Sequence, residues 1–543
     1  MDDTTRLELT KIKLLVLRRK NKSLLEIAAK NIIDNLSIHL ENGQLEKLPF
    51  CMREAVLQEF LSRRSAVPNQ ILCATEFGKK LNEFSTLLHP QTKRIDLNGL
   101  MSFCHSFCMR EMWIKVVQII AARAPNVQSL SFGSKGSMIY EHRLVAAICS
   151  LKELKKLDIS QFSLESQSLT IICDKLKKLE QIQLRSFEDW DHFMEDNEII
   201  DFKRCFERLK VLQFGWQPDL LTNVFRRMCI QHLPRLQFID YFGSTLSNHP
   251  QANILGYGLP SEASSLRHLH TDPTPLPLVE AFPHLTHLTV QWFRGRQYQL
   301  NEIDALLHFT KIEALILDDI PSAEIVDLFL NKYGKDLLEL KIFSLFLELQ
   351  FKEIFKSCPK LEKLTVQGAL MVDDSESIQF YAKLREFEYF PLNGMPANGT
   401  LTLSNILSAP LLESVVIFLN IYRHNVDQTD LVRVSSLISD KSILSRVKTL
   451  NFHIGEVHMT DPQVGCTLFK ALSEITKNAC AFLPNCSSSL VHFKFVSTCP
   501  SDTLRRFYLK EHAFDAIHEE SFYRSLGDEN YAKFAYACVM GET

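Results

Sequence analysis

Glycine and proline are scarce in this chain, at 18 and 20 of 543 residues. With so few backbone-breaking residues and an apolar fraction of 46%, long disordered stretches are not expected. Long apolar runs are also missing, because none approaches the roughly 20 residues that a membrane-spanning helix needs. We therefore expect most of the chain to fold, and to fold without a membrane.

An excess of charge of one sign is absent as well. The chain carries 61 basic and 64 acidic residues, for a net charge of −3, so no overall field attracts nucleic acid or anionic lipid. The start, Met1-Asp2-Asp3, is acidic and does not resemble a signal peptide. We expect a protein of the cytoplasm or the nucleus whose 14 cysteines remain thiols, with neither nucleic acid nor membrane among its partners.

A Leu-x-x-Leu-x-Leu motif recurs from about residue 92 onward. Consecutive copies are mostly separated by about 24–30 residues. Clear copies begin at Leu154, Leu179, Leu209, Leu285, Ile312, Leu361, Val447 and Leu490, and weaker ones begin near Val127, Leu236, Leu266, Leu337, Leu384 and Leu412. Many copies in phase indicate a repeat array.

Each motif has a period of two, which is typical of a strand, and the segment after it changes to helical spacing, as at Leu169, Ile172 and Leu176. Each unit is therefore a strand followed by a helix. The predicted fold is an α/β leucine-rich-repeat solenoid, a horseshoe with a parallel sheet on the concave face and helices on the convex face. We expect strands at 155–159, 210–214, 286–290 and 362–366.

Three regions are predicted. Residues 1–90 form a small N-terminal helical region for adaptor binding, 91–500 form the solenoid, and 501–543 form a C-terminal helical cap. Spacing becomes irregular after Leu412, which leaves the register there open.

Two short segments precede the repeats. On a helix capped by Ser23, with Glu26 three residues later, Leu24, Ala28 and Ile32 fall on one stripe. A small residue at the middle of the stripe lets a partner approach closely, and the leucine can insert as an anchor. The pattern predicts a docking helix.

The second segment begins with Leu48 and Pro49. Proline suits the first turn of a helix, and Met52 and Val56 then share one face. Two short helices bury little by themselves, so we expect another surface to cover these faces.

The first segment, Ser-Leu-x-x-x-Ala-x-x-x-Ile, resembles the elongin C-binding box of substrate receptors in cullin-RING ubiquitin ligases, with Ala28 where cysteine is most frequent. The second, Leu-Pro-x-x-Met-x-x-x-Val, is similar to the cullin-2 box. Receptors that join these boxes to leucine-rich repeats include relatives of the melanoma antigen PRAME and of nematode zygote-arrest proteins. The resemblance implies that Ser23, Leu24, Ala28 and Ile32 bind elongin C, that Leu48, Pro49, Met52 and Val56 bind a cullin, and that elongin B is a further partner.

Two alternatives remain open from the residues alone. Leu24, Ile32, Met52 and Val56 could simply cap the first repeat, in a protein binder that works like ribonuclease inhibitor. The Leu48-Pro49 pair also suits an F-box-like domain that binds a Skp-type adaptor.

Motifs for chemistry are missing. There is no phosphate-binding glycine loop, nucleophile elbow or zinc-protease helix, so we expect no catalysis, cofactor or metal. Cys104-His105-Ser-Phe-Cys108 lacks a second ligand pair and is interpreted as buried thiols. The residues between the inward leucines are candidates for holding a target protein on the concave face: Phe242, His268, His270, His287, Phe343, Glu388, Phe390 and Phe418.

Overall fold

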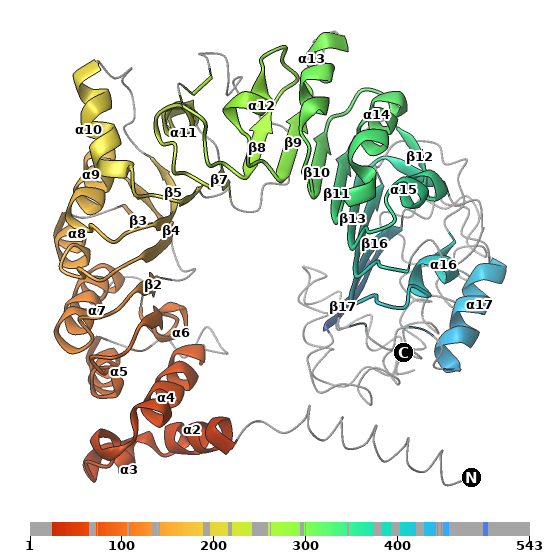
Figure 1. The fold of residues 1–543 in the computed structure, drawn as a ribbon. Helices are drawn as coiled ribbons and strands as arrows, with labels where there is room; N and C mark the ends of the chain where they lie inside the picture. Colours follow the sequence, from red (N-terminus) through yellow and green to blue (C-terminus); the bar gives the residue numbers. More distant parts are fainter. Residues whose placement is uncertain are drawn as a thin grey trace. The chain divides into compact units, whose positions relative to one another are not determined.

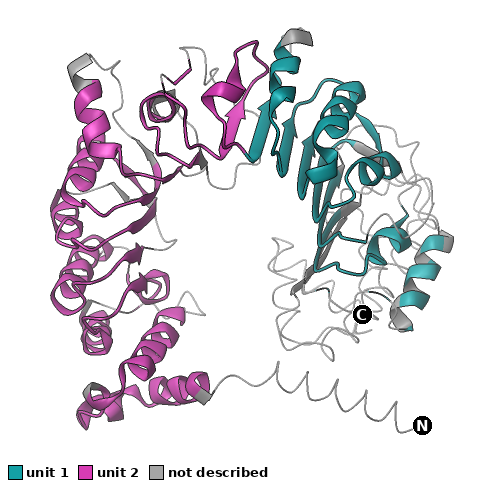
Figure 2. Cartoon of the chain, in the orientation of Figure 1, with its two compact units in different colours: residues 1–21, 286–543 teal, residues 22–285 magenta. Residues whose placement is uncertain are grey.

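The structure is a computed structural model, and two compact units divide the chain. Unit 2 spans residues 22–285, and unit 1 is described between residues 286 and 497 (Figure 2). The described residues are 24–63, 72, 74–105, 108–132, 138–139, 142–187, 196–214, 220–241, 259–260, 262–293, 298, 300–344, 347–372, 382–391, 402–419, 428–440, 443, 447, 449–454 and 492–497. The predicted C-terminal cap, 501–543, lies outside them.

Unit 2 begins with helices and continues with alternating strands and helices. Its elements are α2 (Leu24–Asp34), α3 (Leu36–Glu41), η1 (Leu45–Lys47), α4 (Phe50–Ser62), α5 (Ala74–Leu87), β1 (Arg94–Asp96), α6 (Asn98–Met101), α7 (Met109–Arg123), β2 (Ser129–Ser131), β3 (Met138–Ile139), α8 (His142–Ile148), β4 (Lys156–Leu164), α9 (Ser166–Lys175), β5 (Gln181–Phe187), α10 (Asp196–Phe206), β6 (Val211–Phe214), α11 (Leu220–His232), β7 (Phe238–Tyr241), β8 (His268–Thr271) and α12 (Leu278–Ala281).

Strands β1, β2, β4, β5, β6 and β7 of unit 2 form one parallel sheet in that order, with β3 beside β4. Helices α7, α8 and α9 all lie on one side of this sheet (Figure 1). A parallel strand order with a helix between most neighbours is the arrangement expected of a strand-helix repeat.

Unit 1 repeats the same pattern. Its elements are β9 (His287–Gln291), α13 (Leu300–Asp304), η3 (Ala305–His308), β10 (Ala314–Asp318), α14 (Ala323–Tyr333), η4 (Gly334–Asp336), β11 (Glu339–Phe343), β12 (Glu348–Gln350), α15 (Phe351–Ser357), β13 (Lys363–Gly368), β14 (Leu370–Val372), β15 (Glu386–Pro391), α16 (Leu403–Leu407), β16 (Ser414–Leu419), α17 (Gln428–Ser439), β17 (Thr449–Ile454) and β18 (His492–Ser497). Strands β9, β10, β11, β13, β15, β16, β17 and β18 pair in parallel in that order, and β12 pairs separately with β14.

The motif leucines form columns through the core. Leu157 pairs in register with Leu130 on one side and with Ile182 on the other, and all three are 0% exposed. In unit 1 the equivalent column passes through Leu315 and Leu340, which are also 0% exposed. Equivalent positions stack on one another because the parallel strands pair with their motifs in register. Full burial of a leucine is worth about 1.5–3 kcal/mol, so many similar contacts share the stabilisation.

Backbone hydrogen bonds join successive repeats at the start of each strand. The carbonyl of Lys155 accepts from the N–H groups of Glu180 and Gln181, at 2.9 and 3.0 Å. The carbonyl of Glu362 does the same for Arg385 and Glu386, at 2.8 and 3.0 Å. This carbonyl ladder recurs along both sheets and needs no particular side chain.

The N-terminal helices pack against one another and against the first strand. Helix α2 lies on α4, and an ion pair of 2.8 Å joins Asp34 to Arg63. Arg53 of α4 donates to the carbonyls of Leu87 and Leu88, at 3.1 and 2.8 Å, and to that of Thr86. A cation at these carbonyls satisfies the end of α5, where the helix leaves acceptors without intrahelical partners.

The predicted strands and their parallel pairing are confirmed. The segments expected at 155–159, 210–214, 286–290 and 362–366 correspond to β4, β6, β9 and β13. The irregular spacing after Leu412 still yields strands at its two motifs, because β17 pairs with β18 and Leu450 is in register with Phe493. The horseshoe curvature of the whole array stays a prediction. Within the part of the chain that the structure describes, no helix has the length and apolar character to cross a membrane.

Candidate functional site

The open face of a sheet is its side opposite the helices. On β11, β13 and β15 the inward residues Leu340, Leu364 and Phe387 are 0% exposed, so the alternating residues occupy the open face. These make the open-face grid: Glu339, Lys341, Phe343, Lys363, Thr365, Gln367, Glu386, Glu388 and Phe390. All except Thr365 are partly exposed.

The two phenylalanines of the grid flank a glutamine. Phe343 and Phe390 each pair in register with Gln367, from the strands on either side. Strand spacing places the two positions roughly 9–10 Å apart. Partly exposed aromatic rings on a polar sheet are the kind of anchor that dominates protein recognition.

The charged part of the grid is largely neutralised within itself. Lys341 Nζ lies 2.7 Å from Glu339 Oε1, and Lys363 Nζ lies 3.0 Å from Glu386 Oε1. The hydrogen bond with Glu386 raises the pKa of Lys363. Glu388 differs, because it accepts a hydrogen bond of 3.3 Å from Thr365 and has no ion pair among the described residues. The grid therefore offers two aromatic rings beside one carboxylate.

Other residues proposed for target binding are distributed unevenly. His287 is exposed on β9 and shares a 2.8 Å hydrogen bond with Thr286. His268 and His270 were predicted to face solvent, but they are only 9% and 2% exposed, and His268 stacks on Phe238 at 5.2 Å. Phe418 lies on β16 outside the part whose side chains are described, and Phe242 lies outside the described residues altogether.

The first N-terminal segment is helical, as predicted, from Leu24. Ala28 and Ile32 are partly exposed, whereas Ala29 and Ile33 are 2% and 8% exposed and belong to the core. The most exposed apolar residues of the helix are Ile27 at 52% and Leu25 at 38%. Ser23 lies outside the described residues, as does the side chain of Leu24. Leu25 and Ile27 are two residues apart and lie on different sides of the helix, whereas Leu25, Ala28 and Ile32 share one partly exposed stripe.

The second segment begins a helix immediately after Pro49, as the sequence predicts. Leu48 and Met52 are partly exposed, and Pro49 is exposed. Val56, however, is 0% exposed, so its side chain is not available to a partner in this conformation. Phe50 is 36% exposed and packs its ring against His89 at 5.1 Å.

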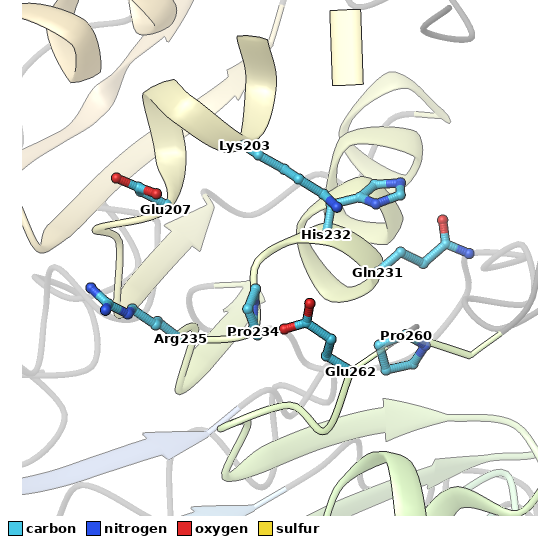
Figure 3. A pocket seen from close by; sticks show the side chains of 8 residues that line it. All are labelled: Lys203, Glu207, Gln231, His232, Pro234, Arg235, Pro260 and Glu262. Carbon is cyan, nitrogen blue, oxygen red and sulfur yellow. The ribbon is translucent and has the colours of Figure 1, made fainter. Parts of the chain in front are cut away.

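A small pocket lies at the ends of α10 and α11 (Figure 3). Its volume is about 210 Å³. The lining residues are Lys203, Glu207, Gln231, His232, Pro234, Arg235, Pro260 and Glu262. Burial, together with nearby Lys203, lowers the pKa of His232, so this ring is neutral at pH 7. The charges of the two basic and the two acidic side chains in the lining offset each other, so the pocket favours neither an anion nor a cation.

Within the described segments, no three His, Cys, Asp or Glu side chains come together in the way that a metal site would need. The cysteines of these segments are free thiols.

Comparison with known proteins leaves the family open. No protein-family model and no curated protein sequence matches the chain. Among solved structures, the chain is similar to an internalin from Listeria monocytogenes at 10% identity, over 85% of this chain and 94% of that one, with a TM-score of 0.22. That score is below the range in which two chains share a fold, so the architecture rests on the strand pairing and burial described above.

Proposed function

We propose that this protein is a non-catalytic binding protein that holds a target protein on the open-face grid. One observation carries the proposal: Phe343 and Phe390 are partly exposed on either side of Gln367, on strands whose register is fixed by the buried residues between them. The paired strands fix the backbone at both positions, so little backbone entropy is lost when a partner covers the rings.

A photo-crosslinking residue at Gln367 tests this proposal. We expect it to capture a target that is lost when Phe343→Ala and Phe390→Ala are introduced, and that a crosslinker at Lys356 on helix α15 does not capture. Lys356 is 68% exposed and lies on the helical side, so it controls for chance collisions. Equal capture at both positions would show that the open face has no special role.

We further propose that the N-terminal helices connect this binding face to a ubiquitin ligase, as the resemblance of the two segments implies. In this view elongin C, with elongin B, binds α2, a cullin binds the start of α4, and the chain is the substrate-recognition subunit. The proposal is supported by the exposed stripe of α2 that Leu25, Ala28 and Ile32 share, and by the accessible residues Pro49 and Met52. Such an amphipathic helix suits an apolar groove on a partner.

Reconstitution with purified adaptors separates this proposal from its alternatives. We expect the full chain to co-purify with elongin B, elongin C and a cullin, and Leu24→Asp to abolish elongin C binding because a carboxylate would have to lose its water. The matched control is Glu26→Gln on the same helix, which leaves the apolar surface intact. Binding to a Skp-type adaptor would instead identify an F-box-like receptor. Binding to none of these adaptors would leave a protein binder that is not part of a ligase.

The proposed compartment is the cytoplasm or the nucleus. The balanced charge and the free thiols of the described cysteines agree with this placement.

A further inference from the structure

Two thiols lie in contact in the connection between α6 and α7. The sulfur atoms of Cys104 and Cys108 are 3.7 Å apart, and both point to the carbonyl of His105, at 3.6 and 3.3 Å. Cys104 is 2% exposed, whereas Cys108 is partly exposed. The pair therefore has one buried residue and one that is partly exposed.

Backbone hydrogen bonds fix both positions. The N–H of Cys104 donates to Met101 at 3.0 Å, and Cys104 forms an isolated parallel bridge with Leu72. The N–H of Cys108 donates to His105 at 3.1 Å, and its carbonyl accepts from Met112 at 3.1 Å at the start of α7. A disulfide needs about 2.05 Å between the sulfurs, so the gap must close by roughly 1.7 Å, which rotation of the two side chains can supply.

We propose that Cys104 and Cys108 are a redox modification site, at which hydrogen peroxide converts the two thiols into a reversible disulfide. The Cys108 sulfur attacks one peroxide oxygen, the O–O bond breaks, and Cys108 becomes a sulfenic acid as water leaves. The Cys104 sulfur then attacks the Cys108 sulfur, the S–O bond breaks, and the hydroxyl group leaves as water with the proton of Cys104. Two thiols lose two electrons and two protons, and hydrogen peroxide is reduced to two molecules of water.

The order of the two steps follows from the surroundings of the two cysteines. Burial foremost, and then the hydrogen bond with Cys108, raises the pKa of Cys104 to about 12, so Cys104 is a thiol at pH 7. A thiol reacts slowly with peroxide, because the thiolate is the nucleophile. Cys108 is the more exposed residue of the two, so we expect its sulfur to react first.

The disulfide would close a short turn beside the N-terminal helices. Phe103 precedes Cys104, and its ring lies 4.3 Å from Lys80 Nζ of helix α5. The loop between the two cysteines is short, so little chain entropy is removed and the fold should gain little stability. The expected signature is chemical, not a large change in melting temperature.

Peroxide treatment of the reduced full chain, followed by alkylation and peptide mass mapping, tests the proposal. We expect the peptide that contains both cysteines to lose about 2 Da, to escape alkylation and to regain both thiols with dithiothreitol. Cys104→Ser should leave Cys108 as a sulfenic acid that dimedone traps, whereas Cys108→Ser should give no adduct at Cys104. Cys51→Ser is the matched control, because Cys51 is exposed on α4, and it should leave the result unchanged.

Full alkylation of both cysteines in oxidised wild-type protein would overturn the proposal. So would a disulfide that joins either cysteine to another one, or protection of both thiols by Zn²⁺ with no 2 Da loss on oxidation, since that would indicate a metal site. The wild-type measurement decides the matter even if a serine variant fails to fold.

Discussion

Met52 and Val56 lie one turn apart on α4, yet Met52 is partly exposed and Val56 is completely buried. The helix passes from the surface into the core within that turn. Its first turn can contact a partner, while its later turns hold the N-terminal helices together.

This difference predicts opposite results for one substitution at the two positions. Met52→Asp should leave the melting temperature nearly unchanged and abolish cullin binding. Val56→Asp should unfold the N-terminal helices, because an unpaired carboxylate would be buried at a cost of several kcal/mol. Circular dichroism melting beside cullin pull-down measures both effects. Equal destabilisation by the two variants would place Met52 in the core too and leave no cullin contact on this helix.

Phe343→Ala together with Phe390→Ala should weaken target capture and lower the free energy of unfolding by less than about 1 kcal/mol, because both rings are partly exposed. Leu340→Ala on β11, the strand of Phe343, is the control. It should lower the free energy of unfolding by about 2–5 kcal/mol, since Leu340 is 0% exposed. Urea unfolding gives the stabilities. A loss of similar size in the phenylalanine variant would mean that these rings support the fold.

Arg53→Ala should destabilise the N-terminal helices by about 1.5–3 kcal/mol, because three carbonyls at the end of α5 lose a charged donor. Arg53→Lys should recover only part of this loss, since one ammonium keeps the charge but lacks the planar fork that reaches all three carbonyls. Urea unfolding of both variants checks the order. Full recovery by lysine would show that charge alone matters here.

Two carboxylates on α14 should respond to pH in opposite ways. Burial foremost, with Glu353 and Glu324 nearby, raises the pKa of Asp327 in the folded protein, so its charge opposes folding at neutral pH. Asp327→Asn should raise the melting temperature at pH 7, and the gain should shrink as the pH falls toward the ordinary value of 3.8.

Glu324 is the matched case, because its hydrogen bond with Ser322 lowers its pKa. Its contribution to stability is present above the unfolded value of 4.5 and is lost as the pH falls through the folded pKa. Glu324→Gln should therefore lower the melting temperature at pH 7 and approach the wild type in acid. Melting curves from pH 4 to pH 8 test both variants, and a shift of the same sign in both would refute the assignment.

The strands could be predicted from the sequence because their cause is local. Alternation of the kind seen at Leu157 and Ile159 determines which side chains turn inward, and both are 0% exposed. Helical spacing located α2 and α4 for the same reason. Even the two widely spaced motifs near the C-terminal end of the described chain form strands, because pairing depends on the motif and not on the length between motifs.

Accessibility could not be predicted in the same way. Alternation assigned His268 and His270 to the open side, but it cannot tell what covers that side, and both are buried. On α2, the stripe through Ala28 and Ile32 lies beside another apolar stripe, through Ala29 and Ile33, and only the packing of α4 decides which one is buried. The 3.7 Å contact of Cys104 and Cys108 was visible in the sequence only as a spacing of four residues.

The carbonyl ladder makes the whole repeat the natural unit of change in this chain. Each junction is made by peptide groups that every residue type except proline can supply, so a repeat can be copied or removed between equivalent ladder positions without a new set of side chains. Removal of one repeat would place side by side the open-face residues of two strands that are not neighbours now. The buried leucines of these two strands would still be in register. Such a chain can acquire a new binding surface by rearranging repeats that already fold, with no substitution at any single position.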